Sequence, residues 1–295
     1  MTDPKMLAQI EDGQGFIAAL DQSGGSTPGA LKGYGVAEDA YSTDEEMFGL
    51  IHAMRSRIIT SPCFTGDKVI GAILFEKTMD GEVGGEPVPH ALWKRGVVPF
   101  LKVDKGLENE ADGVKLMKPM PDLDVLLERA VAKGVFGTKM RSVIERASPT
   151  GIAAIVAQQF EFAEQIAAKG LMPIIEPEVS INSPDRDACD RMLLTELVKA
   201  LDALPDGRQV MLKLTLPVEA NLYAPLVDHP RVLRVVALSG GFSREEACQQ
   251  LARNRGMIAS FSRALLSDLK SQMSDDEFNQ SLGTAIDEIH SASIA

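Results

Sequence analysis

Short runs of apolar and β-branched residues recur along the whole chain, and each has the length of a buried strand. Polar segments with helical periodicity separate most of these runs. The runs occupy residues 15–21, 69–75, 97–103, 135–143, 171–177, 209–216, 232–239 and 257–262. The pattern therefore predicts eight strands that alternate with helices.

Several of the separating segments carry helix start signals. A capping box satisfies two backbone N–H groups at a helix start, and proline is well tolerated at the first helical position. Residues 151–170 place apolar side chains on one helical face and end at a glycine, which is typical of a helix C-terminus. The predicted caps are Thr43 with Glu46, Ser243 with Glu246, Ser148 before Pro149, and Ser183 before Pro184.

Repeated strand–helix units predict a parallel sheet, for which the alternatives are an open doubly wound sheet and a closed barrel. Eight units within 295 residues favour an α/β fold with a single (β/α)8 TIM barrel, one domain spanning residues 1–295. Residues 271–295 are predicted to form a polar C-terminal helical tail. Segments 22–43 and 76–90 are rich in Gly, Ser and Pro and follow the first two strands, so we expect them to be loops on the active face.

Charge and composition argue against a protein that binds nucleic acid, lies in or on a membrane, or is secreted. A formal net charge of -12 would repel nucleic acid and anionic membranes, and no apolar run approaches the length of a membrane span. The N-terminus lacks the apolar core of a signal peptide. Three cysteines, far apart and without C-x-x-C spacing, fit reduced thiols. We therefore expect a cytoplasmic protein without nucleic-acid or membrane partners. The sequence does not reveal the quaternary state, and a homo-oligomer is left open.

Polar residues stand near the end of almost every predicted strand. In a barrel these ends converge on one face, so residues far apart in the sequence would share one pocket. Several cations beside two or three carboxylates suit a small anionic substrate and leave groups for proton transfer, as a phosphorylated carbonyl compound requires. The set comprises Asp21, Lys102, Asp104, Lys139, Arg141, Glu176, Glu178, Lys213, Ser239 and Arg263.

Lys213 interrupts the apolar run "QVMLKLTL". One reading is an interior lysine that merely pairs with an acid. The other is a nucleophile, since partial burial among other cations favours the neutral amine that attacks a ketone. The polar character of the predicted pocket favours a Schiff-base enzyme.

The stretch "LSGGFSREE" places Ser239 and two glycines just before a capped helix. Free backbone N–H groups and the helix dipole favour a phosphate at such a position. Arg263 follows the eighth predicted strand, where this fold often completes a phosphate site. We expect one phosphate to bind here.

From about residue 15 to residue 266 the sequence resembles the class I fructose-bisphosphate aldolases. The resemblance lies in several motifs that keep the family's order. These are "ALDQSGGS" with an active-site aspartate, "KVDKG", "KMR", "IIEPEV" with a glutamate, "LKLTLP" with the Schiff-base lysine, and the phosphate loops "LSGG" and "SFSRAL".

The resemblance implies reversible cleavage of fructose 1,6-bisphosphate in glycolysis and gluconeogenesis, with no metal and no cofactor. It implies that Lys213 forms the imine, that Glu176 transfers protons, that Asp21 acts at the C4 hydroxyl, and that Lys139 and Lys102 assist. Ser239, Gly240 and Arg263 would hold the phosphate beside the ketone, and Lys32 and Arg141 are candidates for the other phosphate. The complete set of expected substrate and phosphate contacts is Lys102, Arg141, Ser239, Gly240, Arg263, Ser23, Lys32 and Glu178.

Three departures from the animal enzymes point to the compact bacterial branch of the family. The chain ends "SASIA" without a terminal tyrosine, Gln22 stands where those enzymes have an acid, and the "SFSR" loop differs. Other Schiff-base barrel lyases, such as transaldolases or deoxyribose-phosphate aldolases, are the enzymatic alternative. A non-catalytic sugar-phosphate sensor is the alternative from another class. The four histidines lack ligand spacing, which counts against a zinc-dependent aldolase.

Overall fold

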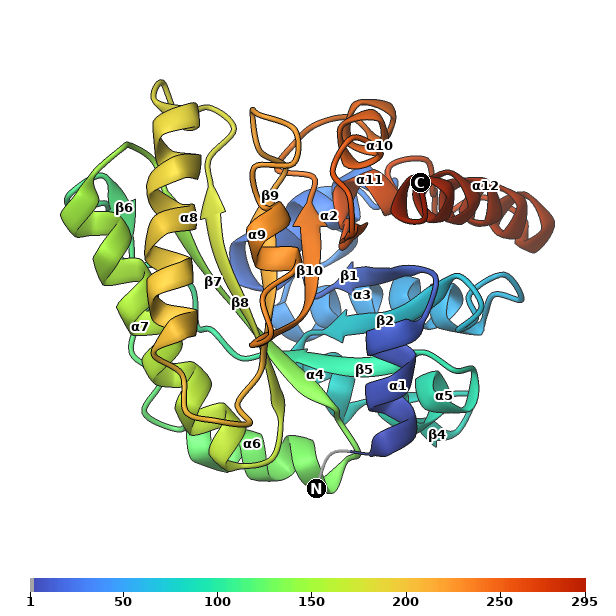
Figure 1. The fold of residues 1–295 in the computed structure, drawn as a ribbon. Helices are drawn as coiled ribbons and strands as arrows, with labels where there is room; N and C mark the ends of the chain where they lie inside the picture. Colours follow the sequence, from blue (N-terminus) through green and yellow to red (C-terminus); the bar gives the residue numbers. More distant parts are fainter. Residues whose placement is uncertain (1–2) are drawn as a thin grey trace.

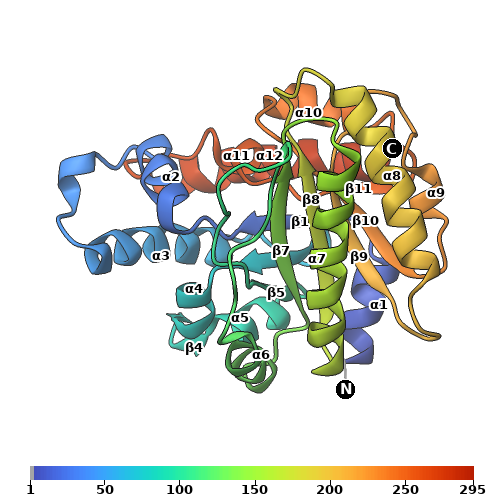
Figure 2. The ribbon, with the colours of Figure 1, turned by 90° about the vertical axis from the view of Figure 1, so that its left-hand side faces the viewer.

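All eight predicted strands are present in the computed structural model, which describes residues 3–295 (Figure 1 and Figure 2). Their bounds differ from the sequence prediction by at most three residues. They are β1 (Phe16–Leu20), β2 (Val69–Leu74), β5 (Val98–Lys102), β7 (Gly137–Ile144), β8 (Met172–Val179), β9 (Val210–Thr215), β10 (Val232–Leu238) and β11 (Met257–Ala259).

The eight strands pair in the order of the chain, and every neighbouring pair is parallel. The sheet curls until its two ends meet, where Ala19 N donates a hydrogen bond to Phe261 O at 3.2 Å. The predicted (β/α)8 barrel, nearly closed, is thereby confirmed. Three short strands lie outside it: β6 (Val114–Lys115), antiparallel to β7, and the hairpin β3 (Glu82–Val83) with β4 (Glu86–Pro87).

Helices follow the strands and cover the outer face of the sheet. Figure 2 shows α7 and α8 side by side along the strands that precede them. The long helices are α3 (Asp44–Thr60), α6 (Leu123–Ala132), α7 (Pro149–Ala168), α8 (Arg186–Asp202) and α12 (Asp275–Ser293). The shorter ones are α1 (Pro4–Asp12), η1 (Gly24–Ser26), α2 (Thr27–Gly33), η2 (Glu38–Ala40), α4 (Glu76–Asp80), α5 (Val88–Lys94), α9 (Ala224–Val227), α10 (Arg244–Leu251) and α11 (Arg263–Leu266).

Most predicted helix starts are confirmed. Both capping boxes form at α3 and α10, and Ser148 caps α7 with proline at its first position. The expected cap at Ser183 is wrong, because α8 begins at Arg186. Ser183 Oγ instead accepts a hydrogen bond from Asp185 N at 3.3 Å, which closes a turn over Pro184 and delays the helix.

Segments 22–43 and 76–90 are not the plain loops that their composition predicts. The first contains η1, α2 and η2, and the second contains α4, the hairpin and the start of α5. The hydrophobic residues Leu31 and Tyr34 in the first segment, and Met79 and Val88 in the second, are buried against the core. These apolar anchors give both segments helical structure despite their glycine content.

Two apolar clusters lie on the two faces of the sheet. The larger contains Leu212 and Leu214 of β9 and packs against the helices, whereas the smaller contains Met211 and fills the barrel interior. The N-terminal helix α1 contributes two residues to the interior cluster. Since side chains alternate along a strand, Lys213 shares the interior face with Met211. The position of Lys213 on β9 thus directs its side chain into the barrel.

We predict that Phe100→Ala destabilises the barrel by about 3–5 kcal/mol, because it empties part of the interior cluster. Phe100 is fully buried and packs edge-to-face against Phe136, with ring centroids 5.4 Å apart. Val125→Ala on α6, whose side chain is exposed, is the control and should change the free energy of unfolding by less than about 0.5 kcal/mol. Urea unfolding measures both, and equal effects would contradict this description of the core.

Candidate active site

A cavity of about 720 Å³ opens at the carboxyl ends of the strands. Residues from the ends of β1, β5, β7, β8, β9 and β10 line it, together with α2 and the segment after β11. Parallel barrels place their active sites at this end. All the pocket residues expected from the sequence line this cavity, except Lys32 and Asp104.

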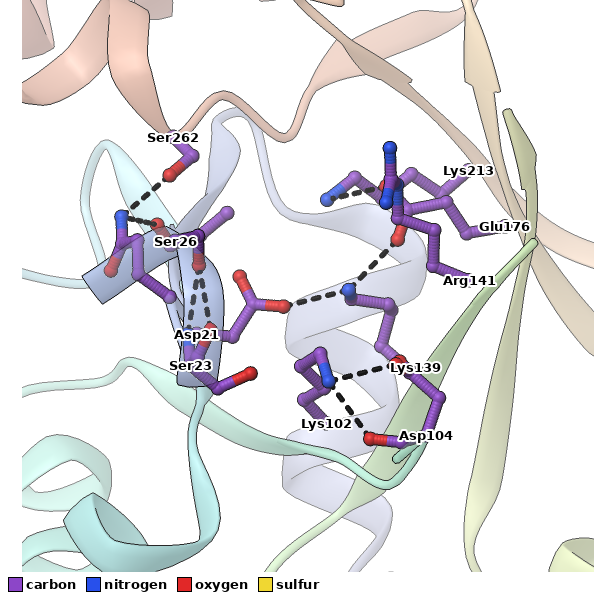
Figure 3. Close-up of polar contacts among 12 residues, drawn as sticks. Asp21, Ser23, Ser26, Lys102, Asp104, Lys139, Arg141, Glu176, Lys213 and Ser262 are labelled. Carbon is purple, nitrogen blue, oxygen red and sulfur yellow. Dashed lines mark hydrogen bonds and ion pairs between the residues drawn. The ribbon is translucent and has the colours of Figure 1, made fainter. Parts of the chain in front are cut away.

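Lys139 lies at the centre of a buried ion-pair chain (Figure 3). Its Nζ is 2.7 Å from Asp21 Oδ2 and 2.9 Å from Glu176 Oε2. The other carboxylate oxygen of Glu176, Oε1, is 3.2 Å from Lys213 Nζ. All four residues are at most 9% exposed. Strands β1, β7, β8 and β9 thus each bring one charged side chain into contact.

The charged groups of this ion-pair chain reinforce one another's charged states. Burial alone would raise the pKa of Asp21, but the ammonium groups of Lys139 and Lys213 outweigh it and hold that pKa well below its ordinary value. Burial would likewise lower the pKa of Lys139, but Asp21 and Glu176 outweigh it and raise that pKa well above its ordinary value. Lys139 is therefore a fixed cation between two carboxylates, whereas Lys213 contacts only one.

The helix layer fixes the strand that carries Glu176. Gln159 of α7 accepts a hydrogen bond from Glu176 N through Oε1 at 2.9 Å and donates through Nε2 to Ser142 Oγ at 2.6 Å. Thr215 Oγ1 donates to Val179 O at 2.7 Å, which ties the end of β9 to the end of β8. These buried contacts leave Glu176 little freedom to move relative to Lys213.

Two further ion pairs lie at the rim of the cavity. Lys102 Nζ is 2.8 Å from Asp104 Oδ1, and Arg141 pairs with Glu178. Burial would lower the pKa of Arg141, but its hydrogen bond and charge interaction with Glu178 raise that pKa above its ordinary value. Lys102, Arg141 and Glu178 line the cavity, so each pair leaves polar groups that face it.

The loop after β10 has a backbone that favours glycine and leaves little room for a side chain at Gly240. Gly240 has φ 62° and Gly241 φ 123°, so both adopt backbone conformations that favour glycine. A Cβ at Gly240 would lie 2.7 Å from Ile181 Cγ2, and one at Gly241 would lie 3.4 Å from Arg263 Nη2. The Arg263 guanidinium therefore lies directly against the glycine loop beside Ser239. This brings together the three residues expected to hold one phosphate.

Lys32 does not join the other candidates. It is exposed, and its Nζ lies 3.3 Å from Glu38 Oε1 outside the cavity. Lys270, which the sequence analysis did not select, does line the cavity and donates from Nζ to Gly33 O at 2.6 Å. Its position seven residues after Arg263, in the segment that leads away from the last strand, was the available signal.

The sequence analysis also missed several neutral residues of the cavity, among them Gln22, Ser26, Ser260 and Ser262. Each lies within a motif, "ALDQSGGS" or "SFSRAL", from which only Asp21, Ser23 and Arg263 were selected. Within residues 3–295, no group of three or more His, Cys, Asp or Glu is arranged to hold a metal ion. No helix in the same range has the length and apolar character needed to cross a membrane.

Two solved structures share the fold of this chain. Fructose-bisphosphate aldolase from Plasmodium falciparum, in complex with TRAP and a small molecule inhibitor, matches with a TM-score of 0.81 at 20% identity, covering 98% of this chain and 93% of that one. Cgl0159 from Corynebacterium glutamicum matches with a TM-score of 0.55 at 14% identity, covering 99% and 92%. At these identities the likeness concerns the fold.

A family model extends the comparison to the sequence. The model described as fructose-bisphosphate aldolase class-I matches residues 6–225, well over half of the chain. This span contains all four residues of the buried ion-pair chain, which are Asp21, Lys139, Glu176 and Lys213. Barrel, cavity and family model agree, and the chain belongs to the class-I fructose-bisphosphate aldolase family.

Proposed function

We propose that this chain cleaves fructose 1,6-bisphosphate reversibly to dihydroxyacetone phosphate and glyceraldehyde 3-phosphate, through an imine on Lys213. The observation that carries the proposal is the contact between Lys213 Nζ and Glu176 Oε1 at 3.2 Å inside the cavity. A lysine nucleophile needs a group beside it that can manage protons, and this carboxylate is in reach.

In the proposed mechanism, Lys213 Nζ attacks the C2 carbonyl and Glu176 supplies the proton with which water leaves the carbinolamine. Asp21, ionised at neutral pH, takes the proton of the C4 hydroxyl. The C3–C4 bond then breaks, and its electron pair passes into the imine to give an enamine, while glyceraldehyde 3-phosphate leaves. Protonation of the enamine and hydrolysis of the imine release dihydroxyacetone phosphate and restore Lys213.

Charge pairing supports a substrate with two phosphates. The basic residues that line the cavity are Lys102, Lys139, Arg141, Lys213, Arg263 and Lys270. The first four each form an ion pair with a carboxylate, whereas Arg263 and Lys270 form none with the described residues. Arg263 lies against the glycine loop and Lys270 against the end of α2. We propose that Arg263 holds the phosphate beside the ketone and that Lys270 holds the other.

The remaining parts of the proposal follow from this chemistry. Because the imine draws electrons from the breaking bond, the reaction needs neither a metal nor another cofactor. Lys102, Ser23, Arg141 and Glu178 would contact the sugar between the two phosphates. A cytoplasmic role in glycolysis and gluconeogenesis fits this substrate.

Borohydride reduction in the presence of dihydroxyacetone phosphate should leave one stable adduct on Lys213. Peptide mapping by mass spectrometry locates it. Lys213→Met should abolish both the adduct and cleavage, while circular dichroism shows an unchanged fold. An adduct on Lys102 or Lys139, or full activity without any adduct, would remove Lys213 from its proposed role. Adduct formation without any cleavage of ketose phosphates would favour a sensor.

Chelation provides a separate test of the metal-independent mechanism. We expect kcat/KM to stay unchanged after dialysis against EDTA, because the imine performs the electron withdrawal that a metal supplies in other enzymes. Assays of the dialysed protein with and without added Zn²⁺ give the comparison. Activity that disappears on chelation and returns with zinc would contradict the proposal.

Replacing Lys270 should distinguish the two phosphate positions. Loss of a charge-assisted contact in Lys270→Met should lower kcat/KM for fructose 1,6-bisphosphate about 10- to 100-fold. Cleavage of fructose 1-phosphate, which lacks the second phosphate, should change little. Lys118→Met is the matched control, since Lys118 is exposed and lies outside the cavity. An equal loss of kcat/KM with both substrates would mean that Lys270 does not bind the second phosphate.

A further inference from the structure

Arg55 of α3 is a fully buried charge that the proposed mechanism does not use. It forms no ion pair with any carboxylate of residues 3–295. Nη1 donates to Thr78 Oγ1 at 2.7 Å, and Nη2 donates to Gln22 O at 2.6 Å and to Gln22 Oε1 at 3.1 Å. Burial lowers the pKa of Arg55 to about 10, against the opposing charge of Asp21, so the guanidinium stays protonated at neutral pH. A buried charge without a counterion is costly and calls for a role.

The contacts of Arg55 fix the direction of the Gln22 amide. A guanidinium can only donate hydrogen bonds, so the oxygen of the amide must face Arg55. At the other end, Gln22 Nε2 lies 2.6 Å from Ser262 Oγ and 3.4 Å from Ala19 O. Since a backbone carbonyl can only accept, the nitrogen must face that side. Both ends of the side chain therefore require the same orientation.

This orientation determines what Ser262 can do. Ser262 Oγ accepts a hydrogen bond from Gln22, and its own proton has no acceptor among the described residues. Ser262, whose side chain is drawn in Figure 3, lines the cavity and directly precedes Arg263 in the sequence. A hydroxyl whose oxygen already accepts is left to donate, and an anion in the cavity is the acceptor that this arrangement suits.

We propose that Arg55 and Gln22 are positioning residues that fix the direction of a hydrogen-bond chain, so that Ser262 donates to the substrate phosphate held by Arg263. The inference rests on the proposed function for the source of that phosphate. Arg55 donates to Gln22, Gln22 donates to Ser262, and Ser262 donates to the anion. Polarisation along such a chain strengthens its last bond. Arg55 thus influences the cavity through Gln22 and Ser262, although it does not line the cavity itself.

The same contacts hold the loop in place. Ala19 N donates to Phe261 O at 3.2 Å, one residue before Ser262, so β1 and the loop that follows β11 are joined at two adjacent points. Because Gln22 follows Asp21 directly, the hydrogen-bond chain also links the loop that follows β11 to the carboxylate proposed to act at C4. A glutamine can connect Arg55 to Ser262 in this direction, since its amide oxygen accepts one hydrogen bond and its amide nitrogen donates the next.

A double-mutant cycle at positions 22 and 262 tests the inference. Ser262→Ala should raise KM for fructose 1,6-bisphosphate about 10-fold through loss of a bond to a charged group, with a much smaller change in kcat. Gln22→Met, which keeps the length of the side chain, should do the same. The double variant should be no worse than either single one, because Gln22 is proposed to act only through the hydroxyl of Ser262. Independent effects would multiply to about 100-fold and would overturn the inference.

Three further variants examine the direction itself. Gln22→Glu keeps the shape but turns the group facing Ser262 into an acceptor, so Ser262 would donate to residue 22 and KM should rise at least as much as in Ser262→Ala. Arg55→Met should behave like Gln22→Met, and Arg55→Lys, which can still donate, should recover part of the loss. Gln14→Met, at an exposed position outside the cavity, is the control. Thermal unfolding identifies any variant that fails to fold, and the position 22 variants then decide the question.

Calorimetric binding of inorganic phosphate separates this inference from the proposed function. The same four proteins of the cycle should show the same coupling in phosphate affinity. One outcome is that the unmodified protein cleaves no ketose phosphate while the four proteins show this coupling in phosphate affinity. In that case the proposed function is wrong, and the inferred hydrogen-bond chain is supported. If the unmodified protein binds no phosphate, or if the losses multiply, the chain from Arg55 to Ser262 has no such role.

Discussion

The ammonium of Lys139, buried between the carboxylates of Asp21 and Glu176, is the contact on which the arrangement of the cavity depends. Three charged groups from β1, β7 and β8 meet where water is largely excluded. Each alone would be costly to bury, and their mutual attraction offsets that cost. The barrel supplies the geometry, since it brings the ends of strands that are far apart in the sequence to one face. Removing Lys139 would leave two adjacent carboxylates without compensation.

This arrangement separates the roles of two lysines that lie beside the same glutamate. Lys139 is held as a cation by two carboxylates, whereas Lys213 touches only one oxygen of Glu176. One lysine can thus organise charge while the other is available to react. Arg55 is a second buried cation, and it is connected through Gln22 to Ser262, on which we propose that it acts. In both places a buried charge sets the behaviour of a neighbour.

Much of the fold could be predicted from sequence because buried strands and capped helices have strong local signals. The alternation around Lys213 set the lysine on the opposite face of β9 from Leu212 and Leu214 but left open whether that face was the interior or the helix layer, and the structure shows that it is the interior. Barrel closure could not be read from local pattern, since it depends on a contact between Ala19 and Phe261. Ser183 was misread because serine before proline also suits a turn. Composition likewise concealed the helix in residues 27–33, whose stability comes from burial of Leu31.

Charged site residues were easier to identify than neutral ones. A lysine or glutamate inside an apolar strand is conspicuous, as at Lys139 and Glu176, and ten of the cavity's polar residues were found in that way or through a motif. Lys32 and Lys270 show the limit of this reasoning, since both lie on polar segments and only the fold decides which of them faces the cavity. Gln22 and Ser262 gain their significance only from the hydrogen bonds around them.

The most direct test of the account is the rate of imine formation in Glu176→Gln, measured by borohydride trapping in a single turnover with dihydroxyacetone phosphate. The account predicts that the folded variant forms the imine about 10²- to 10⁴-fold more slowly, because the proton transfer at the carbinolamine loses its acid and base. Asp21→Asn, the matched variant on the other side of Lys139, should form the imine at nearly the normal rate but fail to cleave fructose 1,6-bisphosphate. Imine formation at the normal rate in Glu176→Gln would contradict the account.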